Sequence, residues 1–109
     1  MEGVNLHQLC RQIIERYAQE PSPEGVELRP SIDETHGEYS LFMVGWQGAR
    51  RIHGLMIHLE VRDDKIWIQS DGTPEGVVDE LLEAGVREKQ LVLAWQHPFK
   101  RQFTPFAVS

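Results

Sequence analysis

The stretch EYSLFMVGWQGARRIHGLMIHLEVRDDKIWIQ, residues 38–69, contains successive segments rich in β-branched and aromatic residues. Segments 38–47 and 51–61 flank Gly48-Ala49, a pair that suits the turn of a β-hairpin. A further segment follows Asp63-Asp64, and aspartate tolerates the left-handed backbone of a tight turn better than most residues. The stretch therefore predicts an antiparallel meander of long strands, to which residues 25–30 add one more.

The alternation of side chains shows which faces of this meander are apolar. Leu55, Ile57, Leu59 and Val61 have the same parity and are expected on one face of their strand. Residues 39–47 are apolar at both parities, whereas a sheet with one wet face alternates more cleanly. We therefore expect part of the second face to be covered, by a helix, by the C-terminal tail or by another chain.

The N-terminal residues repeat with helical periodicity. Apolar residues recur at the i, i+3, i+4, i+7 spacing, which predicts a helix over about 5–19 with Asn5 as its N-cap. Pro21 ends the pattern, because proline cannot continue a helix. Cys10, the only cysteine, falls on the apolar face, so no intrachain disulfide can form and we expect a buried thiol.

The corner Asp71-Gly72-Thr73 either starts a second helix or holds a phosphate. As a helix start, it offers Thr73 as N-cap and Pro74 at the first helical position, and Gly85 ends the helix. As a phosphate site, it lacks the glycine spacing of the known loops, and Asp71 would repel the anion. The structural interpretation is favoured.

The C-terminal residues combine a short strand, 90–95, with a tail, 96–109, that carries Phe99, Phe103 and Phe106. The favoured interpretation is that the tail folds back over the open sheet face. The alternative is a docking segment, since aromatic residues beside arginine are common interface anchors. The predicted fold is α+β: an N-terminal helix, an antiparallel β-meander of about four strands, a second helix, and a short C-terminal strand and tail, in a single domain over residues 1–109.

Charge and composition narrow the function. The formal net charge is −6, from 17 acidic and 11 basic residues, which argues against broad, independent DNA binding. Short basic patches occur at Arg50-Arg51 and Lys100-Arg101. No apolar run approaches the roughly 20 residues that span a bilayer, and the N-terminus lacks the pattern of a signal peptide. We expect a cytoplasmic protein.

No catalytic, cofactor-binding or metal-binding residue is predicted. The histidines do not pair at a metal-ligand spacing, and no serine lies in a nucleophile elbow. Glu60 with Asp64 superficially resembles the carboxylate pair of a metal-dependent nuclease, but Arg62 stands where such enzymes have lysine. Asp64 is better explained as a turn residue.

Several motifs in order resemble one family, the XisI proteins, known as fdxN element excision controlling factors. The matching features are V-G-W-x-G at 44–48, K-I-W-I-Q at 65–69, D-G-T-x-x-G at 71–76, L-V-L-A-W at 91–95 and R-Q-x-T-x-F-A at 101–107. The resemblance runs from about residue 5 to the C-terminus; Arg87, where the family pattern has proline, departs from it. It implies a small α+β accessory factor that acts with a companion XisH-like protein, while a separate recombinase performs the chemistry.

The leading hypothesis is thus a non-enzymatic accessory factor that binds an XisH-like protein partner. The predicted contact residues are the aromatic and arginine side chains Trp46, Trp67, Phe99, Arg101, Phe103 and Phe106. An alternative is a direct DNA-binding excisionase-type factor, which needs both basic patches on one surface; otherwise DNA contact is indirect or weak. A homodimer would cover the second sheet face, as the tail would.

Overall fold

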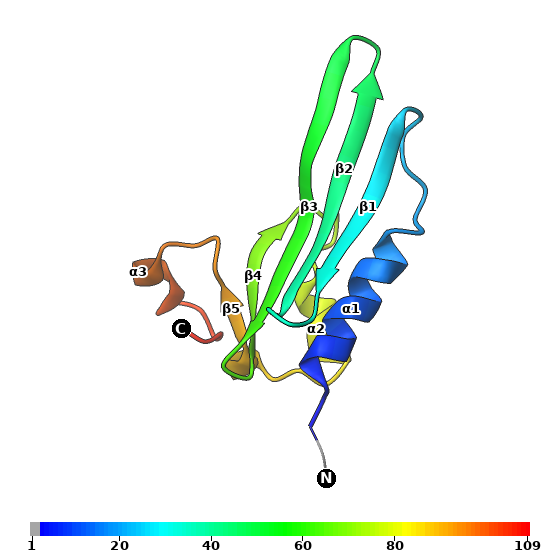
Figure 1. Cartoon of the computed structure of the whole chain (residues 1–109). Coiled ribbons are helices and arrows are strands. Elements are labelled where there is room, and N and C mark those ends of the chain that lie inside the picture. Colours follow the sequence, from blue (N-terminus) through cyan, green and yellow to red (C-terminus); the bar gives the residue numbers. More distant parts are fainter. Residues whose placement is uncertain (1–2) are drawn as a thin grey trace.

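The computed structural model describes residues 3–109, and its centre is a five-stranded sheet (Figure 1). The strands follow the chain order: β1 Val26–Asp33, β2 Glu38–Gln47, β3 Arg50–Arg62, β4 Lys65–Asp71 and β5 Leu91–Leu93. The helical elements are α1 Leu6–Tyr17, α2 Val78–Glu83, the 3₁₀ turn η1 Glu88–Gln90 and α3 Pro98–Arg101. Strands β1 to β4 are antiparallel neighbours, and β5 joins β4 in parallel. The predicted α+β class and meander are confirmed.

The two predicted hairpin turns are formed as the sequence indicates. Gln47 pairs with Arg50, so Gly48-Ala49 is a two-residue loop, and Gly48 has φ +60°. Arg62 pairs with Lys65, and Asp63 and Asp64 have φ 54° and 59°. In the Asp63-Asp64 turn, two consecutive left-handed residues give the backbone twist that matches two antiparallel strands. In the first turn Gly48 alone is left-handed, and glycine at this position is also typical of hairpin turns. These turns fix the register of the meander.

The hydrophobic core lies at one end of the sheet, between the sheet and helices α1 and α2. Its sheet side is a set of completely buried residues from neighbouring strands: Tyr39, Leu41, Ile57, Leu59, Ile66 and Ile68. Cys10 and Ile14 of α1 and Leu81 of α2 pack against them and are also fully buried. Burial raises the pKa of the Cys10 thiol to about 12, because the apolar surroundings disfavour the thiolate. No helix within residues 3–109 is long and apolar enough to cross a membrane.

Helix α1 begins as predicted, with the side chain of Asn5 accepting a hydrogen bond from the backbone N–H of Gln8 at 3.0 Å. The predicted start of the second helix is wrong. Helix α2 begins at Val78 and not after Thr73, because Gly76 has φ +82°, which no right-handed helix contains. Gly85, at φ +103°, follows the helix as predicted.

The side chain of Asp71 organises the corner that leads into α2. One carboxylate oxygen accepts hydrogen bonds from the backbone N–H of Thr73 at 3.1 Å and from its hydroxyl at 2.7 Å. The other oxygen accepts from the N–H of Val77 at 2.8 Å, immediately before the helix. The structural interpretation of the corner therefore stands, with Asp71 in the role predicted for Thr73.

A β-bulge reverses the predicted parity along β3. Leu41 of β2 pairs with Ile57 and the next residue, Phe42, pairs with Leu55, so Met56 is an extra residue on β3. Met56 therefore packs against the core, and Leu55 lies on the opposite face with 40% of its surface exposed. The prediction that Leu55 shares a face with Ile57 is wrong for this reason.

The hairpin of β2 and β3 projects beyond α1 (Figure 1). On this projecting part the second sheet face stays open: Trp46 is 53% exposed. The tail returns to the edge of the sheet formed by β5, where Ala107 forms a parallel bridge with Val92. The tail therefore covers the sheet only on its β5 side, which is less than the predicted cover of the open face.

Candidate partner-binding surface

The C-terminal segment is anchored to the sheet by backbone contacts and by one arginine. The N–H of Ala107 donates to the carbonyl oxygen of Leu91 at 2.8 Å. The guanidinium of Arg101 donates to the carbonyl oxygens of Ala94, Gln96 and Val108 at 3.1–3.2 Å. These donors hold the start and the end of the segment together, so α3 is presented in a defined orientation.

Large apolar side chains stand exposed on this anchored segment. Phe99 and Phe103 are 64% and 73% exposed, and their rings meet edge to face at 5.6 Å between centroids. Trp95, in the turn just before α3, is 59% exposed. We call Trp95, Phe99 and Phe103 the C-terminal aromatic patch. Exposed aromatic side chains held by a rigid scaffold are typical of protein-protein contacts.

Trp95 was missed by sequence reasoning. It is the last residue of the strand predicted over 90–95. The observed β5 stops at Leu93, and the following residues turn toward α3, which places Trp95 outside the ladder. The first proline of this region stands at position 98, beyond Trp95, so it does not mark a strand end at Leu93.

Three of the predicted contact residues are engaged within the chain. Arg101 holds the carbonyl oxygens described above. Phe106 is partly buried and packs against the core. The ring of Trp67 lies under the guanidinium of Arg62, with 3.9 Å between Cζ and the ring centroid, and Arg101 Cζ lies 5.7 Å from the same centroid. These side chains shape the region around the patch.

The remaining predicted contact residue, Trp46, lies elsewhere. It is the residue before the last of β2, next to the hairpin turn, and the guanidinium of Arg51 lies over its ring at 5.2 Å. The hairpin tip and α3 are at different ends of the molecule (Figure 1). The predicted residues thus do not form one continuous surface.

The same separation applies to the basic residues. Arg50 and Arg51 begin β3 at the hairpin tip, whereas Lys100 and Arg101 belong to α3. Arg101 is also committed to carbonyl oxygens of its own segment. The two basic patches lie at the hairpin tip and at α3, so they do not form one continuous basic surface.

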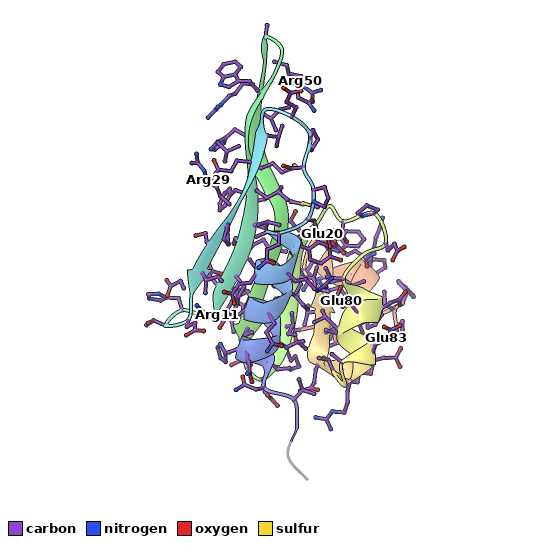
Figure 2. The ribbon with its side chains drawn as sticks, turned by 90° about the vertical axis from the view of Figure 1, so that its right-hand side faces the viewer. Arg11, Glu20, Arg29, Arg50, Glu80 and Glu83 are labelled. Carbon is purple, nitrogen blue, oxygen red and sulfur yellow. The ribbon has the colours of Figure 1, made fainter. Side chains whose placement is uncertain are left out.

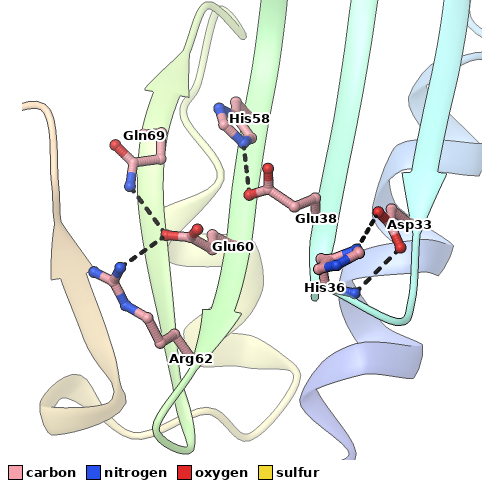
Figure 3. Close-up of polar contacts among 7 residues, drawn as sticks. All are labelled: Asp33, His36, Glu38, His58, Glu60, Arg62 and Gln69. Carbon is pink, nitrogen blue, oxygen red and sulfur yellow. Dashed lines mark hydrogen bonds and ion pairs between the residues drawn. The ribbon is translucent and has the colours of Figure 1, made fainter.

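The carboxylates of the sheet are paired with neighbouring side chains (Figure 3). An oxygen of Glu60 accepts from the Nε2 of Gln69 at 3.2 Å and lies 3.8 Å from the Nη1 of Arg62. Within residues 3–109, no three His, Cys, Asp or Glu side chains gather in a way that could hold a metal ion. Asp64, the proposed companion of Glu60, sits in the β3–β4 turn with positive φ.

Two further pairs appear in the same region (Figure 3). The Nε2 of His58 lies 3.3 Å from a carboxylate oxygen of Glu38. The Nδ1 of His36 lies 2.7 Å from Asp33, and this hydrogen bond lowers the pKa of the Asp33 carboxyl. Both are pairs between exposed or half-exposed groups on adjacent turns and strands. These four residues therefore form ordinary hydrogen-bonded pairs on the protein surface.

Comparison with known proteins agrees with the fold and the motifs. The family model described as XisI protein matches residues 1–108. The chain belongs to the XisI family. Its structure is similar to that of a XisI-like protein from Anabaena variabilis, with a TM-score of 0.88 and 35% sequence identity, covering 94% of this chain and 95% of that chain.

A second solved structure has the same fold. It is that of the fdxN element excision controlling factor XisI from Anabaena variabilis, with a TM-score of 0.80 and 33% identity, again covering 94% of this chain and 95% of that chain. A search of curated proteins gave no match. The XisI resemblance deduced from the ordered motifs is confirmed.

Proposed function

We propose that this XisI-family chain is a non-enzymatic controlling factor for site-specific excision of a DNA element, and that it acts by binding a protein partner. Family membership and the similarity to an excision controlling factor support the role in excision. We further propose that the partner is XisH-like, as the resemblance implies. The recombination chemistry then belongs to another protein.

The observation that carries the proposal is the exposed edge-to-face pair formed by Phe99, on the anchored helix α3, and Phe103, in the turn that follows it. Exposing two phenylalanines to water is unfavourable, by about 25 cal/mol for each Å² of apolar surface. Three hydrogen bonds from Arg101 hold the segment in place, so little conformational entropy is lost when a partner binds it. Trp95 extends the apolar surface before α3.

Direct DNA binding is the weaker alternative. A net charge of −6 repels the phosphate backbone, and the two basic patches lie apart. Contact with DNA through the partner avoids both difficulties.

The proposal is tested by co-purifying the chain with an XisH-like protein and measuring the mass of the complex by light scattering. The Phe99→Ser/Phe103→Ser variant should weaken binding by at least about a hundredfold, since central aromatic residues carry most of an interface's energy. Lys100→Ser, an exposed position on the same helix, is the matched control and should bind like wild type.

Two results would overturn the proposal. One is the absence of any mixed complex with the wild-type chain. The other is a complex that survives the double serine variant unchanged. A loss of binding in Lys100→Ser alone would instead favour an electrostatic contact and the basic-patch alternative.

A further inference from the structure

The projecting hairpin encloses an apolar hollow that no part of the described chain fills. The hollow has a volume of about 440 Å³ and lies between the loop after α1 and strands β1, β2 and β3. Its apolar lining is supplied by Val26, Leu28, Met43, Ile52 and Met56. We call it the hairpin hollow. It lies on the helix side of the sheet, beyond the reach of α1.

Gly54 keeps the hollow open. It lines the hollow and pairs with Met43, whose parity matches that of the core residues Tyr39 and Leu41. A Cβ atom at Gly54 would therefore point to the helix side, and nothing lies within 4 Å of its position. A glycine in the middle of a long strand often marks a site where another chain approaches closely.

Opposite charges stand at the two ends of the hollow. Glu20 lies in the loop just after α1 and Arg50 at the hairpin tip, both on the helix side of the sheet, whereas Arg29 points to the other side (Figure 2). Both Glu20 and Arg50 are exposed, and neither forms an ion pair with another described residue. The surface is thus an apolar hollow with the unpaired carboxylate of Glu20 at one end and, at the other end, Arg50 beside Arg51, which also lines the hollow.

We propose that the hairpin hollow is the interface with a second copy of this chain, related by a two-fold axis. When two such hollows face each other with their hairpins antiparallel, Arg50 of each copy lies opposite Glu20 of the other. A surface with opposite charges at its two ends is self-complementary in this arrangement. Two-fold dimers with the same patch on both subunits are by far the commonest protein oligomers.

The side chains of the hollow suit such a contact. Met43 and Met56 are flexible and can adjust to the facing surface. Ile52 is only half-buried in the single chain, so a second copy would remove further apolar surface from water. This contact uses the helix side of the hairpin and leaves the C-terminal aromatic patch free, so it is independent of the proposed partner.

The test is a charge exchange, followed by sedimentation equilibrium over a series of protein concentrations. The wild-type chain should reach twice the chain mass of 12.6 kDa. Glu20→Arg and Arg50→Glu each place like charges at both ends of the interface, and each should raise the dissociation constant by about tenfold or more. In a mixture of the two variants, each mixed dimer has opposite charges facing each other at both ends of the interface. The mixture should therefore dimerise at the same protein concentrations as the wild-type chain. Gly54→Leu, which fills the hollow without a backbone clash, should also give a monomer, and Gly54→Ala is its smaller control.

A wild-type chain that stays at monomer mass overturns the proposal and leaves the hollow to a different ligand. A dimer that is unchanged in both charge variants also overturns it, because the interface then lies elsewhere. The Phe99→Ser/Phe103→Ser variant should keep the wild-type dimer mass. Failure of the XisH-like interaction is therefore distinguishable from failure of the dimer.

Discussion

The two ends of the β2–β3 hairpin are built from the same strands but differ in what covers them. At the base, Leu41 and Ile57 are completely buried between α1, α2 and the sheet. Toward the tip, Met43 and Ile52 lie on the same side of the sheet, and both are only partly buried beside an open hollow. The apolar pattern is continuous along the strands, whereas the helix cover ends part-way.

The difference follows from the lengths of the helix and the hairpin. A helix of 12 residues, such as α1, is about 18 Å long, whereas the 13 residues of β3 extend about 44 Å. One short helix therefore cannot cover a hairpin of this length. The base stabilises the fold, and the tip leaves apolar surface exposed that the proposed dimer would cover.

The largest expected effect compares two isoleucines of the same strand. Ile57→Ala should lower the free energy of unfolding by about 3–4 kcal/mol, because it leaves a cavity in a closed core. Ile52→Ala should cost about 1 kcal/mol or less, since water already reaches this side chain. Urea unfolding at low protein concentration measures both. Equal losses would show that the hairpin tip is as well packed as the base.

A smaller effect tests the corner that brings α2 over the base. Asp71→Ala should cost about 2 kcal/mol, because three hydrogen-bond donors around the corner lose their acceptor. Thr73→Ala should cost about 0.5–1 kcal/mol, since Asp71 still accepts from two backbone N–H groups. The same unfolding experiment checks the order. A larger loss for threonine than for aspartate would restore Thr73 as the helix cap.

The smallest effect concerns Cys10 and the pH dependence of stability. Its pKa is raised in the folded chain from 9.0 to about 12, so the unfolded chain loses the proton first. The buried, protonated thiol therefore contributes fully to the free energy of unfolding below pH 9. This contribution is lost as the pH rises toward 12. By pH 10 the wild type should lose about 1 kcal/mol more than Cys10→Ala, as measured by urea unfolding. Parallel curves for the two proteins would mean that water reaches the thiol.

Much of the fold was predictable because local patterns and tertiary contacts agree. Asn5 caps α1 through its side chain, which accepts from the N–H three residues along the chain. Gly48-Ala49, Asp63-Asp64 and Gly85 act through their own backbone conformations. Such residues act within a few positions of the chain. The α+β class and the XisI relationship were deduced in the same way, from segments read in order.

Other features depended on contacts that the local rules for strands and helix caps do not cover. The bulge at Met56 arises from the pairing of β3 with β2 and moves Leu55 to the other face. The role of Asp71 depends on a carboxylate that reaches six residues along the chain to Val77. Parity and capping rules describe regular elements, so they fail where a bulge or a long-range side-chain contact replaces the regular pattern.

The candidate contact surfaces were also predictable only in part. The sequence by itself determined that aromatic residues gather in the tail and that the meander is apolar on both sides. Only the tertiary structure decided that Arg101 and Phe106 are used internally, that Trp46 lies apart from Phe99 and Phe103, and that Glu20 and Arg50 flank one hollow. The exposure of a side chain and its distance from other side chains depend on which segments of the chain cover one another. Alternation along a strand specifies a face, and the three-dimensional arrangement alone specifies what covers it.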